Sequence, residues 1–215
     1  MNIQVPTKLN DITLEQYQAF SLINNDEQDQ EFKLHKTISI FTDTDMATVS
    51  KFPVKDAEEI AEDILSVLQI EGTFERHFEL NGIKYGFLPQ LENISLGEYI
   101  DLEDGLKDVK SFHKAAAVMF RPVVKNYGDL YTIQDYEAGL DSMEIMKQAP
   151  LGAITGAVVF FWDIVNVLQK VSQPYLKKSM KENKDTLEKT NSLLNTDGLT
   201  AYSHLVKVIS QSTMK

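Results

Sequence analysis

The pattern of hydrophobic and polar positions contains the same helix-start arrangement twice. Residues 9–17 read LNDITLEQY, and residues 91–99 read LENISLGEY. In each copy a hydroxyl residue precedes Gln or Glu by three positions, the spacing of a capping box, and isoleucine and tyrosine occupy the positions of a hydrophobic staple. The two boxes pair Thr13 with Gln16 and Ser95 with Glu98. Helices are therefore predicted at 14–24 and 96–108.

The similarity between the two copies extends to a second helix in each half. LHK at 34–36 and FHK at 112–114 each open an apolar, helix-forming segment. Both halves are therefore predicted to begin as an αα-hairpin of similar size. Duplication and convergence on a common helix-start pattern both account for the similarity. The equivalent positions of His35 and His113 favour a shared structural role, such as a hydrogen bond to a loop carbonyl.

Helical periodicity fits much of the remaining chain. Apolar residues recur along one face of 54–70, opposite a run of acids, which predicts an amphipathic surface helix. A helix is predicted over about 135–148, and the most hydrophobic segment, 151–168, is predicted to be a buried core helix. A polar helix over 175–195 and a short helix over 199–210 complete the prediction.

Residues 73–89 instead alternate between apolar and charged positions, which is the period of a β-strand. Asn81-Gly82 interrupts the alternation, and both residues tolerate the positive φ of a two-residue hairpin turn. The predicted register pairs Phe78 with Tyr85, Leu80 with Ile83 and Glu79 with Lys84. The apolar face consists of Phe74, Phe78, Leu80, Ile83, Tyr85 and Phe87. Because a lone hairpin is marginal in water, this face is predicted to pack on the chain's own helices or to bind a partner.

The predicted fold is mainly α, a multi-helix domain of seven to nine helices with two αα-hairpin halves and one β-hairpin at about 73–89. Pro122 is expected to end the helix that begins near His113, and a loop is expected over 125–132. Three parts follow: an N-terminal helical half at 1–72, the hairpin with a helical core half at 73–172, and a polar C-terminal helical extension at 173–215.

Composition narrows the class of protein. The 215 residues are 43% hydrophobic and 25% charged, which is typical of a globular chain. The net charge is −11, from 32 acids and 21 bases, so nucleic-acid binding is not expected. The chain has no cysteine, which excludes disulfides, thiolate metal sites and thiol catalysis. Residues 1–6 lack the basic start and apolar core of a signal peptide, which predicts a cytoplasmic protein.

No pattern predicts a catalytic, cofactor-binding or metal-binding site. The four histidines are scattered along the chain, and no phosphate-binding loop, dinucleotide fingerprint or hydrolase motif is present. Asp43-x-Asp45 resembles the start of a calcium loop, but Thr48 stands where that loop needs glycine. Thr42, Asp43 and Thr44 are instead interpreted as helix caps.

Two further patterns each allow two interpretations. The acids Asp101, Glu103 and Asp104 could supply a paired-carboxylate site, although a solvated helix face is the preferred interpretation. Gly152-x-x-x-Gly156 has the spacing of a membrane helix contact. The segment is too short and too often interrupted to span a membrane, so these glycines are expected to admit a neighbouring helix in a buried core.

Several short motifs between residues 86 and 162 belong to no catalytic pattern. They are Gly86-Phe87-Leu88-Pro89, Leu96-Gly97-Glu98-Tyr99-Ile100-Asp101-Leu102, His113-Lys114-Ala115, Met119-Phe120-Arg121-Pro122, Tyr131-x-Ile133-x-x-Tyr136 and Phe160-Phe161-Trp162. Together they resemble proteins of the tail and connector region of tailed bacteriophages. The opening of the chain, with residues 12–17 and the acidic helix, looks like that of phage tail assembly chaperones. Such chaperones are shorter and lack the hairpin and the second helical half.

The resemblance implies a non-enzymatic morphogenesis protein without a cofactor, acting through protein–protein contacts. It leaves open a chaperone that departs from the particle and a structural subunit that stays in it. The partners would be other tail or connector proteins or a second copy of the chain, met in the host cytoplasm or in the virion. Residues 73–89 and 175–195 are expected to make these contacts. Alternatives are a virion ring or cargo protein near the portal, a cytoplasmic helical adaptor, and an enzyme with an acidic site.

Overall fold

The chain is mainly helical and carries a small four-stranded antiparallel sheet. The computed structural model describes residues 3–24, 29–90, 93–127, 130–161 and 163. Met1–Val159 forms one compact unit, and Phe160 lies beyond it. The predicted extension at 173–215, with its helices at 175–195 and 199–210, lies outside the described residues.

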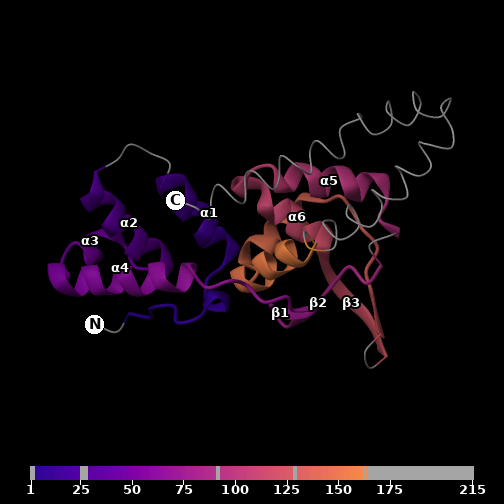
Figure 1. Ribbon diagram of the computed structural model, residues 1–215, viewed down its shortest axis with the longest axis horizontal. Coiled ribbons are helices and arrows are strands. Elements are labelled where there is room, and N and C mark those ends of the chain that lie inside the picture. The colour runs from indigo at the N-terminus through magenta and orange to yellow at the C-terminus, as the bar shows by residue number, and fades with distance from the viewer. Residues whose placement is uncertain (1–2, 25–28, 91–92, 128–129, 162, 164–215) are drawn as a thin grey trace, which may run out of the picture. The chain divides into compact units, whose positions relative to one another are not determined.

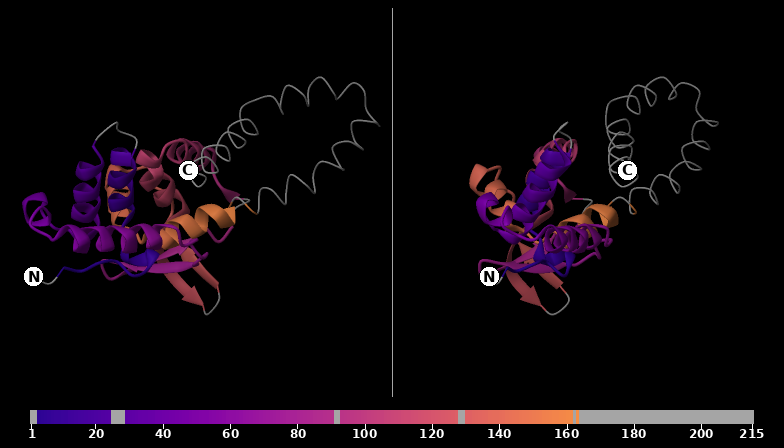
Figure 2. Two further views of the ribbon diagram at one scale, coloured as in Figure 1. Left: turned by 60° about the vertical axis from the view of Figure 1, so that its left-hand side comes forward. Right: turned by 90° about the vertical axis from the view of Figure 1, so that its left-hand side faces the viewer.

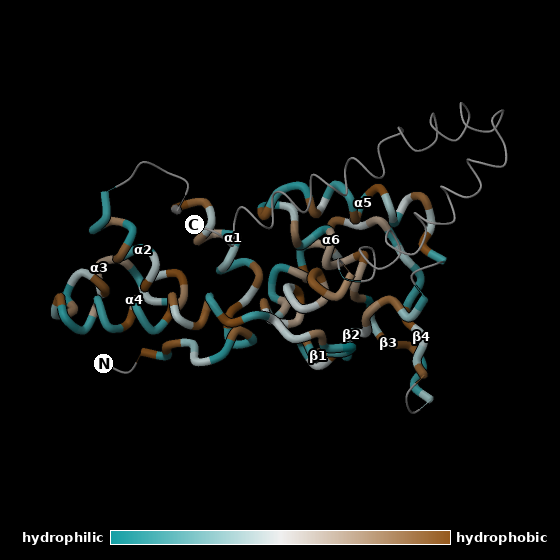
Figure 3. Tube along the Cα trace, in the orientation of Figure 1, coloured by the Kyte–Doolittle hydropathy of each residue, from teal (hydrophilic) through white to brown (hydrophobic). Residues whose placement is uncertain are grey.

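The first part of the chain forms a helical layer around its own small core (Figures 1 and 2). Its elements are the 3-10 turn η1 (Leu9–Asp11) and the helices α1 (Leu14–Asn24), α2 (Gln30–Thr42), α3 (Met46–Val49) and α4 (Val54–Leu68). Helix α2 packs on α1, as predicted for an αα-hairpin, and also on α4. Ile38, Val49, Ala57 and Ala61 are buried where α2, α3 and α4 meet. The exposed face of α4 carries acids, and Figure 3 shows hydrophilic and hydrophobic positions alternating along this helix.

The second half contains the other αα-hairpin. Helix α5 (Leu96–Leu106) leads through the 3-10 turn η3 (Val109–Ser111) to α6 (Phe112–Met119), and α5 packs directly on α6. Both predicted capping boxes form. The Thr13 amide donates to the Gln16 side chain at 2.9 Å, and the Ser95 amide donates to the Glu98 carboxylate at 2.7 Å. The capping-box motifs therefore predict the starts of both αα-hairpins correctly.

The sheet has the strand order β1-β2-β3-β4, with every neighbouring pair antiparallel. Its strands are β1 (His77–Leu80), β2 (Ile83–Phe87), β3 (Phe120–Tyr127) and β4 (Leu130–Ile133). Strands β1 and β2 form the predicted hairpin with the predicted register, Phe78 opposite Tyr85, Glu79 opposite Lys84 and Leu80 opposite Ile83. Asn81 at φ 52° and Gly82 at φ 74° make the turn, as their tolerance of positive φ requires.

The expected loop at 125–132 is wrong, because residues 125–127 belong to β3 and 130–132 to β4, and these strands pair as a second hairpin. Helix α6 ends at Met119, before Pro122 as expected, and β3 begins at the next residue, so Pro122 lies in a strand. The register shifts between Val123 and Lys125, which breaks the two-residue alternation that identifies a strand in the sequence. The predicted helix at 135–148 is shorter, since residues 134–139 have no regular secondary structure before α7 (Leu140–Ile145) and the 3-10 turn η4 (Met146–Gln148).

The hydrophobic segment at 151–161 is helical, as predicted, and it is buried over 151–158 apart from half-buried Thr155, whereas Val159 is exposed. Residues 162 and 164–168 of that prediction lie outside the described residues. Short backbone contacts attach it to the first part of the chain. The amide of Leu14 donates to the Ala149 carbonyl at 3.0 Å, and the amide of Leu151 donates to the Ile12 carbonyl at 2.8 Å. These bonds place the start of α1 beside the start of the core helix.

Gly152 and Gly156 do not admit a neighbouring helix, which corrects the expectation for this pair. A β-carbon at Gly152 would overlap the Asn10 side chain, and one at Gly156 would lie 2.5 Å from the Thr73 carbonyl carbon. The glycines therefore admit η1 and the segment that leads into β1. The spacing of Gly152 and Gly156 correctly predicts that another segment approaches this helix closely. Spacing alone does not identify that segment.

Replacing Gly105 with alanine is expected to destabilise the protein by about 1–3 kcal/mol, because a tightly packed site cannot accept a methyl group without shifting. The added carbon would lie 2.9 Å from the β-carbon of Ala115, so α5 and α6 would have to separate. Gly97 provides the control in the same helix, since nothing lies within 4 Å of its added carbon. Gly97→Ala should stabilise by up to about 1 kcal/mol. Urea denaturation measures both, and equal effects would contradict the close α5–α6 contact.

Candidate functional site

The predicted partner-binding face of β1–β2 is packed largely inside the chain. Phe78, Tyr85 and Phe87 are at most 8% exposed. The Phe120 ring lies 4.9 Å from the Phe78 ring and 5.4 Å from the Phe87 ring, measured between centroids. Phe74 and Leu80 are half-buried, and Ile83 is exposed. Phe78, Tyr85 and Phe87 therefore belong to the core, where Phe120 of β3 contacts two of them, and β3 pairs with the β2 edge.

The hairpin β3–β4 carries three of the exposed large hydrophobic side chains, and two of them lie opposite each other. Val124, Tyr127 and Leu130 are 62%, 65% and 74% exposed, and these three residues are called the outer hairpin end. Tyr127 lies directly opposite Leu130 in the register, so the two side chains form a cross-strand pair on one face. Figures 1 and 2 show β3–β4 extending beyond β1 and β2. The sequence analysis did not identify this surface, because it predicted a loop at 125–132 instead of strands.

Tyr131 attaches the hairpin β3–β4 to β1 and β2. Its hydroxyl donates to the Phe87 carbonyl at 2.6 Å, and its ring lies 4.3 Å from the His77 ring. A β-carbon at Gly86 would lie 2.6 Å from the Tyr131 ring, so the ring needs glycine beneath it. Tyr131 pairs with Asn126, directly beside the Tyr127–Leu130 pair, so the attachment lies next to the outer hairpin end.

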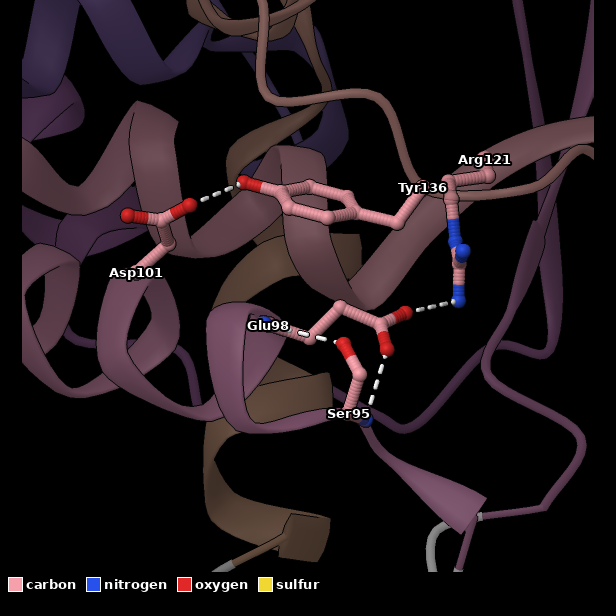
Figure 4. A network of polar contacts seen from close by, with 5 residues as sticks. All are labelled: Ser95, Glu98, Asp101, Arg121 and Tyr136. Atoms are coloured by element: carbon pink, nitrogen blue, oxygen red, sulfur yellow. Dashed lines mark hydrogen bonds and ion pairs between the residues drawn. The ribbon is translucent and has the colours of Figure 1, made fainter.

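A buried polar network joins α5 to β3 (Figure 4). Glu98 accepts from the Ser95 amide through one carboxylate oxygen, and its other oxygen lies 2.8 Å from Nη2 of Arg121. The two side chains are 9% and 12% exposed. Burial raises the pKa of Glu98, but the hydrogen bonds from Ser95 and the Arg121 charge outweigh burial, so the pKa lies below its usual value. The capping residue thus also forms an ion pair with the sheet.

Tyr136 extends the network to Asp101. The Tyr136 hydroxyl donates to the Asp101 carboxylate at 2.7 Å, and the Arg121 guanidinium carbon lies 5.8 Å from the centre of the Tyr136 ring. Burial and the hydrogen bond to Asp101 raise the pKa of Tyr136, so the phenol stays protonated. The other two acids of the run lie elsewhere, since Glu103 and Asp104 approach Lys107 at 4.0 and 2.7 Å. The structure therefore does not bring the three acids together.

A cleft of about 380 Å³ lies beside this network, between the segment after β2, the start of α5 and the segment after β4. Its volume is within the range of small binding sites. Its apolar lining consists of Leu88, Pro89, Ile94 and Ile133. Sequence reasoning missed the cleft because its walls come from three segments that are separated in the sequence.

The two equivalent histidines differ in their surroundings. His113 is buried, and its Nδ1 lies 3.1 Å from the Gln18 amide nitrogen, which also donates to the Val109 carbonyl at 2.7 Å. Burial lowers the pKa of His113, which favours the neutral ring that accepts from Gln18. The His35 residue is half-buried, and its side chain has no hydrogen-bond partner among the described residues. A shared structural role is therefore not observed.

The remaining candidates have local structural roles. Asp43 adopts φ 50° at the end of α2 and caps that helix, as predicted. The cap of α3 is Asp45, which accepts from the Thr48 amide at 2.9 Å, rather than the predicted Thr44. Within the described ranges, no three His, Cys, Asp or Glu residues come together as metal ligands would. The helices in the same ranges include none with the length and hydropathy of a membrane span.

Comparison of the chain with protein-family models, curated protein sequences and solved structures gives no match. The resemblance to phage tail and connector proteins thus stays a prediction from the quoted motifs. A functional assignment depends on the chain's own residues and geometry.

Proposed function

We propose that this chain is a non-enzymatic bacteriophage morphogenesis protein that acts through protein–protein contacts, as a tail assembly chaperone or as a structural subunit of the tail or connector. The phage-like motifs of the sequence support this class. Its partners would be other tail or connector components or a second copy of the chain. The proposal places its action in the host cytoplasm during assembly, and in the virion if the chain is retained.

The observation that carries the proposal is the outer hairpin end. Tyr127 and Leu130 are exposed side by side on a hairpin that Tyr131 attaches to the rest of the sheet. An exposed aromatic and aliphatic pair is typical of the central residues of a protein interface, where tyrosine is enriched. This surface replaces the face of β1–β2 as the candidate docking element, since the core already contains the aromatic residues of that face.

The alternatives give different outcomes. A ring or cargo protein near the portal would use the same surface and would remain in the purified particle, whereas a chaperone would be absent from it. A cytoplasmic helical adaptor would be encoded away from tail and portal genes. An enzyme using the acid run would have to release Asp101 from Tyr136 and the other acids from Lys107. Gene neighbourhood and mass spectrometry of purified particles distinguish these cases.

Replacing Tyr127 and Leu130 together with serine is expected to reduce the yield of complete particles by at least about tenfold, because central interface residues contribute about 2 kcal/mol or more to binding. The stability of the isolated protein should change by less than about 1 kcal/mol, because both side chains are exposed. Electron microscopy counts the particles, and thermal unfolding measures the stability.

Asn126→Ser is the matched control, because Asn126 is an exposed polar residue of the same hairpin. It should leave the particle yield unchanged. An unchanged yield in the double variant would remove the outer hairpin end as the docking element. A yield lost equally in both variants would mean that hairpin structure, rather than its apolar surface, is required.

A further inference from the structure

The cleft beside the Glu98–Arg121 pair has one charged group that the fold does not use. Glu98 is paired with Arg121, and Asp101 accepts from Tyr136. Asp135 also lines the cleft, is exposed, and forms no ion pair with any described residue. Because Glu98 and Arg121 neutralise each other, the cleft presents the single open negative charge of Asp135.

The exposed lining of the cleft is more polar than apolar, and its apolar part includes Ile94 and Ile133, which are half-buried. Leu88 also lines the cleft and is buried. Lysine and arginine place their methylene groups on apolar surface while the charged end reaches a polar group. A small apolar surface beside one open carboxylate therefore suits a lysine or arginine side chain.

Neutral amides complete the lining. Gln90, Asn93 and Gln134 border the cleft, and the Asn93 side chain donates to the Gln90 side chain at 2.7 Å. Each primary amide carries two donors and an acceptor, so these groups retain capacity to bond with a peptide backbone. An extended polypeptide segment supplies the complementary donors and acceptors on both sides of its side chain.

We infer that this cleft binds a lysine or arginine side chain from an extended segment of a partner protein, with Asp135 accepting from the basic group and the amides contacting the partner's backbone. The inference rests on the proposed function, because it names the chemistry of one partner contact. The net charge of −11 supports a basic partner, since complementary charge speeds association. The cleft and the outer hairpin end would then be two separate contact points.

The test uses the full chain and two acetylated, amidated peptides, Ala-Ala-Asn-Arg-Asn-Ala-Ala and the same peptide with glutamine in place of arginine. The change in backbone amide resonances around the cleft on titration measures binding. The arginine peptide should bind about threefold to fivefold more tightly, the contribution of one partly exposed ion pair. Asp135→Asn should abolish this difference. Glu137→Gln is the matched control, because Glu137 is an exposed acid two positions away that does not line the cleft.

Equal binding of the two peptides to the wild-type chain, or no saturable change at the cleft, would overturn the inference. An equal loss in Asp135→Asn and Glu137→Gln would also overturn it, because the attraction would then come from overall charge. The proposed function is measured separately, through particle yield in the Tyr127 and Leu130 variant. A cleft that binds no peptide beside a hairpin that is needed for assembly would reject this inference alone.

Discussion

Replacing Arg121 with methionine is expected to destabilise the protein by about 3 kcal/mol, because removing one partner of a buried ion pair leaves the other charge uncompensated. Glu98 would keep its hydrogen bond from the Ser95 amide but lose the positive charge of Arg121. Urea denaturation at pH 7 measures the change. A loss below about 1 kcal/mol, the usual contribution of a surface pair, would show that solvent already screens this contact.

A second substitution should rescue that loss. Gln16 occupies the equivalent position in the first capping box and completes the box without a charge. Glu98→Gln combined with Arg121→Met should therefore retain the cap and remove both buried charges. The double variant is expected to be more stable than Arg121→Met alone by about 2 kcal/mol, since neutral replacement of a buried pair is often tolerated. Additive losses would contradict a direct pairing.

The stabilisation by Glu98 should also depend on pH in one direction. Its pKa is lowered below the usual 4.5 in the folded protein, so its contribution is present above that value and is lost as the pH falls through the folded pKa. The stability difference between the wild type and Arg121→Met should thus shrink below about pH 4.5. Thermal unfolding at several pH values measures this trend.

Replacing Phe120 with alanine is expected to destabilise the protein by about 3–5 kcal/mol, the usual range for a buried phenylalanine. Phe120 is 1% exposed and begins β3 directly after α6, where its ring contacts both Phe78 and Phe87. Its loss would leave a cavity between the sheet and the helices. Guanidinium denaturation measures the change.

Tyr127→Ala is the control for Phe120→Ala, because it removes an exposed aromatic ring from the same strand. It should cost less than about 1 kcal/mol. Similar losses in both variants would contradict the placement of Phe120 in the core and of Tyr127 on the surface.

Local signals in the sequence predict much of this fold. The hydroxyl residue and the Gln or Glu three positions later locate the starts of α1 and α5, and Asn81-Gly82 sets the register of β1–β2. These features depend on residues within a few positions of one another. The period of the apolar residues likewise identifies α4 and the core helix at 151–161.

The second hairpin could not be predicted in the same way. The register shift after Val123 hides the alternation of β3, and Pro122, a usual helix or strand breaker, lies within that strand. If β3–β4 is not predicted, the β1–β2 hairpin has no neighbouring strand to cover it. From the sequence alone, its aromatic residues therefore fit the protein core and a partner interface equally well.

The polar network and the cleft depend on contacts between distant parts of the chain. Glu98 meets Arg121 only because β3 lies beside the start of α5, and Tyr136 reaches Asp101 across 35 positions. The two capping boxes look alike in the sequence, yet the Gln16 side chain donates to the Ile40 carbonyl while Glu98 pairs with a cation. Spacing within a motif predicts the cap but not the second contact that each cap residue makes.

The most direct test of the proposed role is a count of complete tailed particles from a bacteriophage in which the gene for this chain is interrupted. Electron microscopy of the lysate provides the count, and the intact gene supplied separately provides the control. We expect complete particles to be lost and to return with the intact gene. A normal number of complete particles without the gene would contradict a role in morphogenesis.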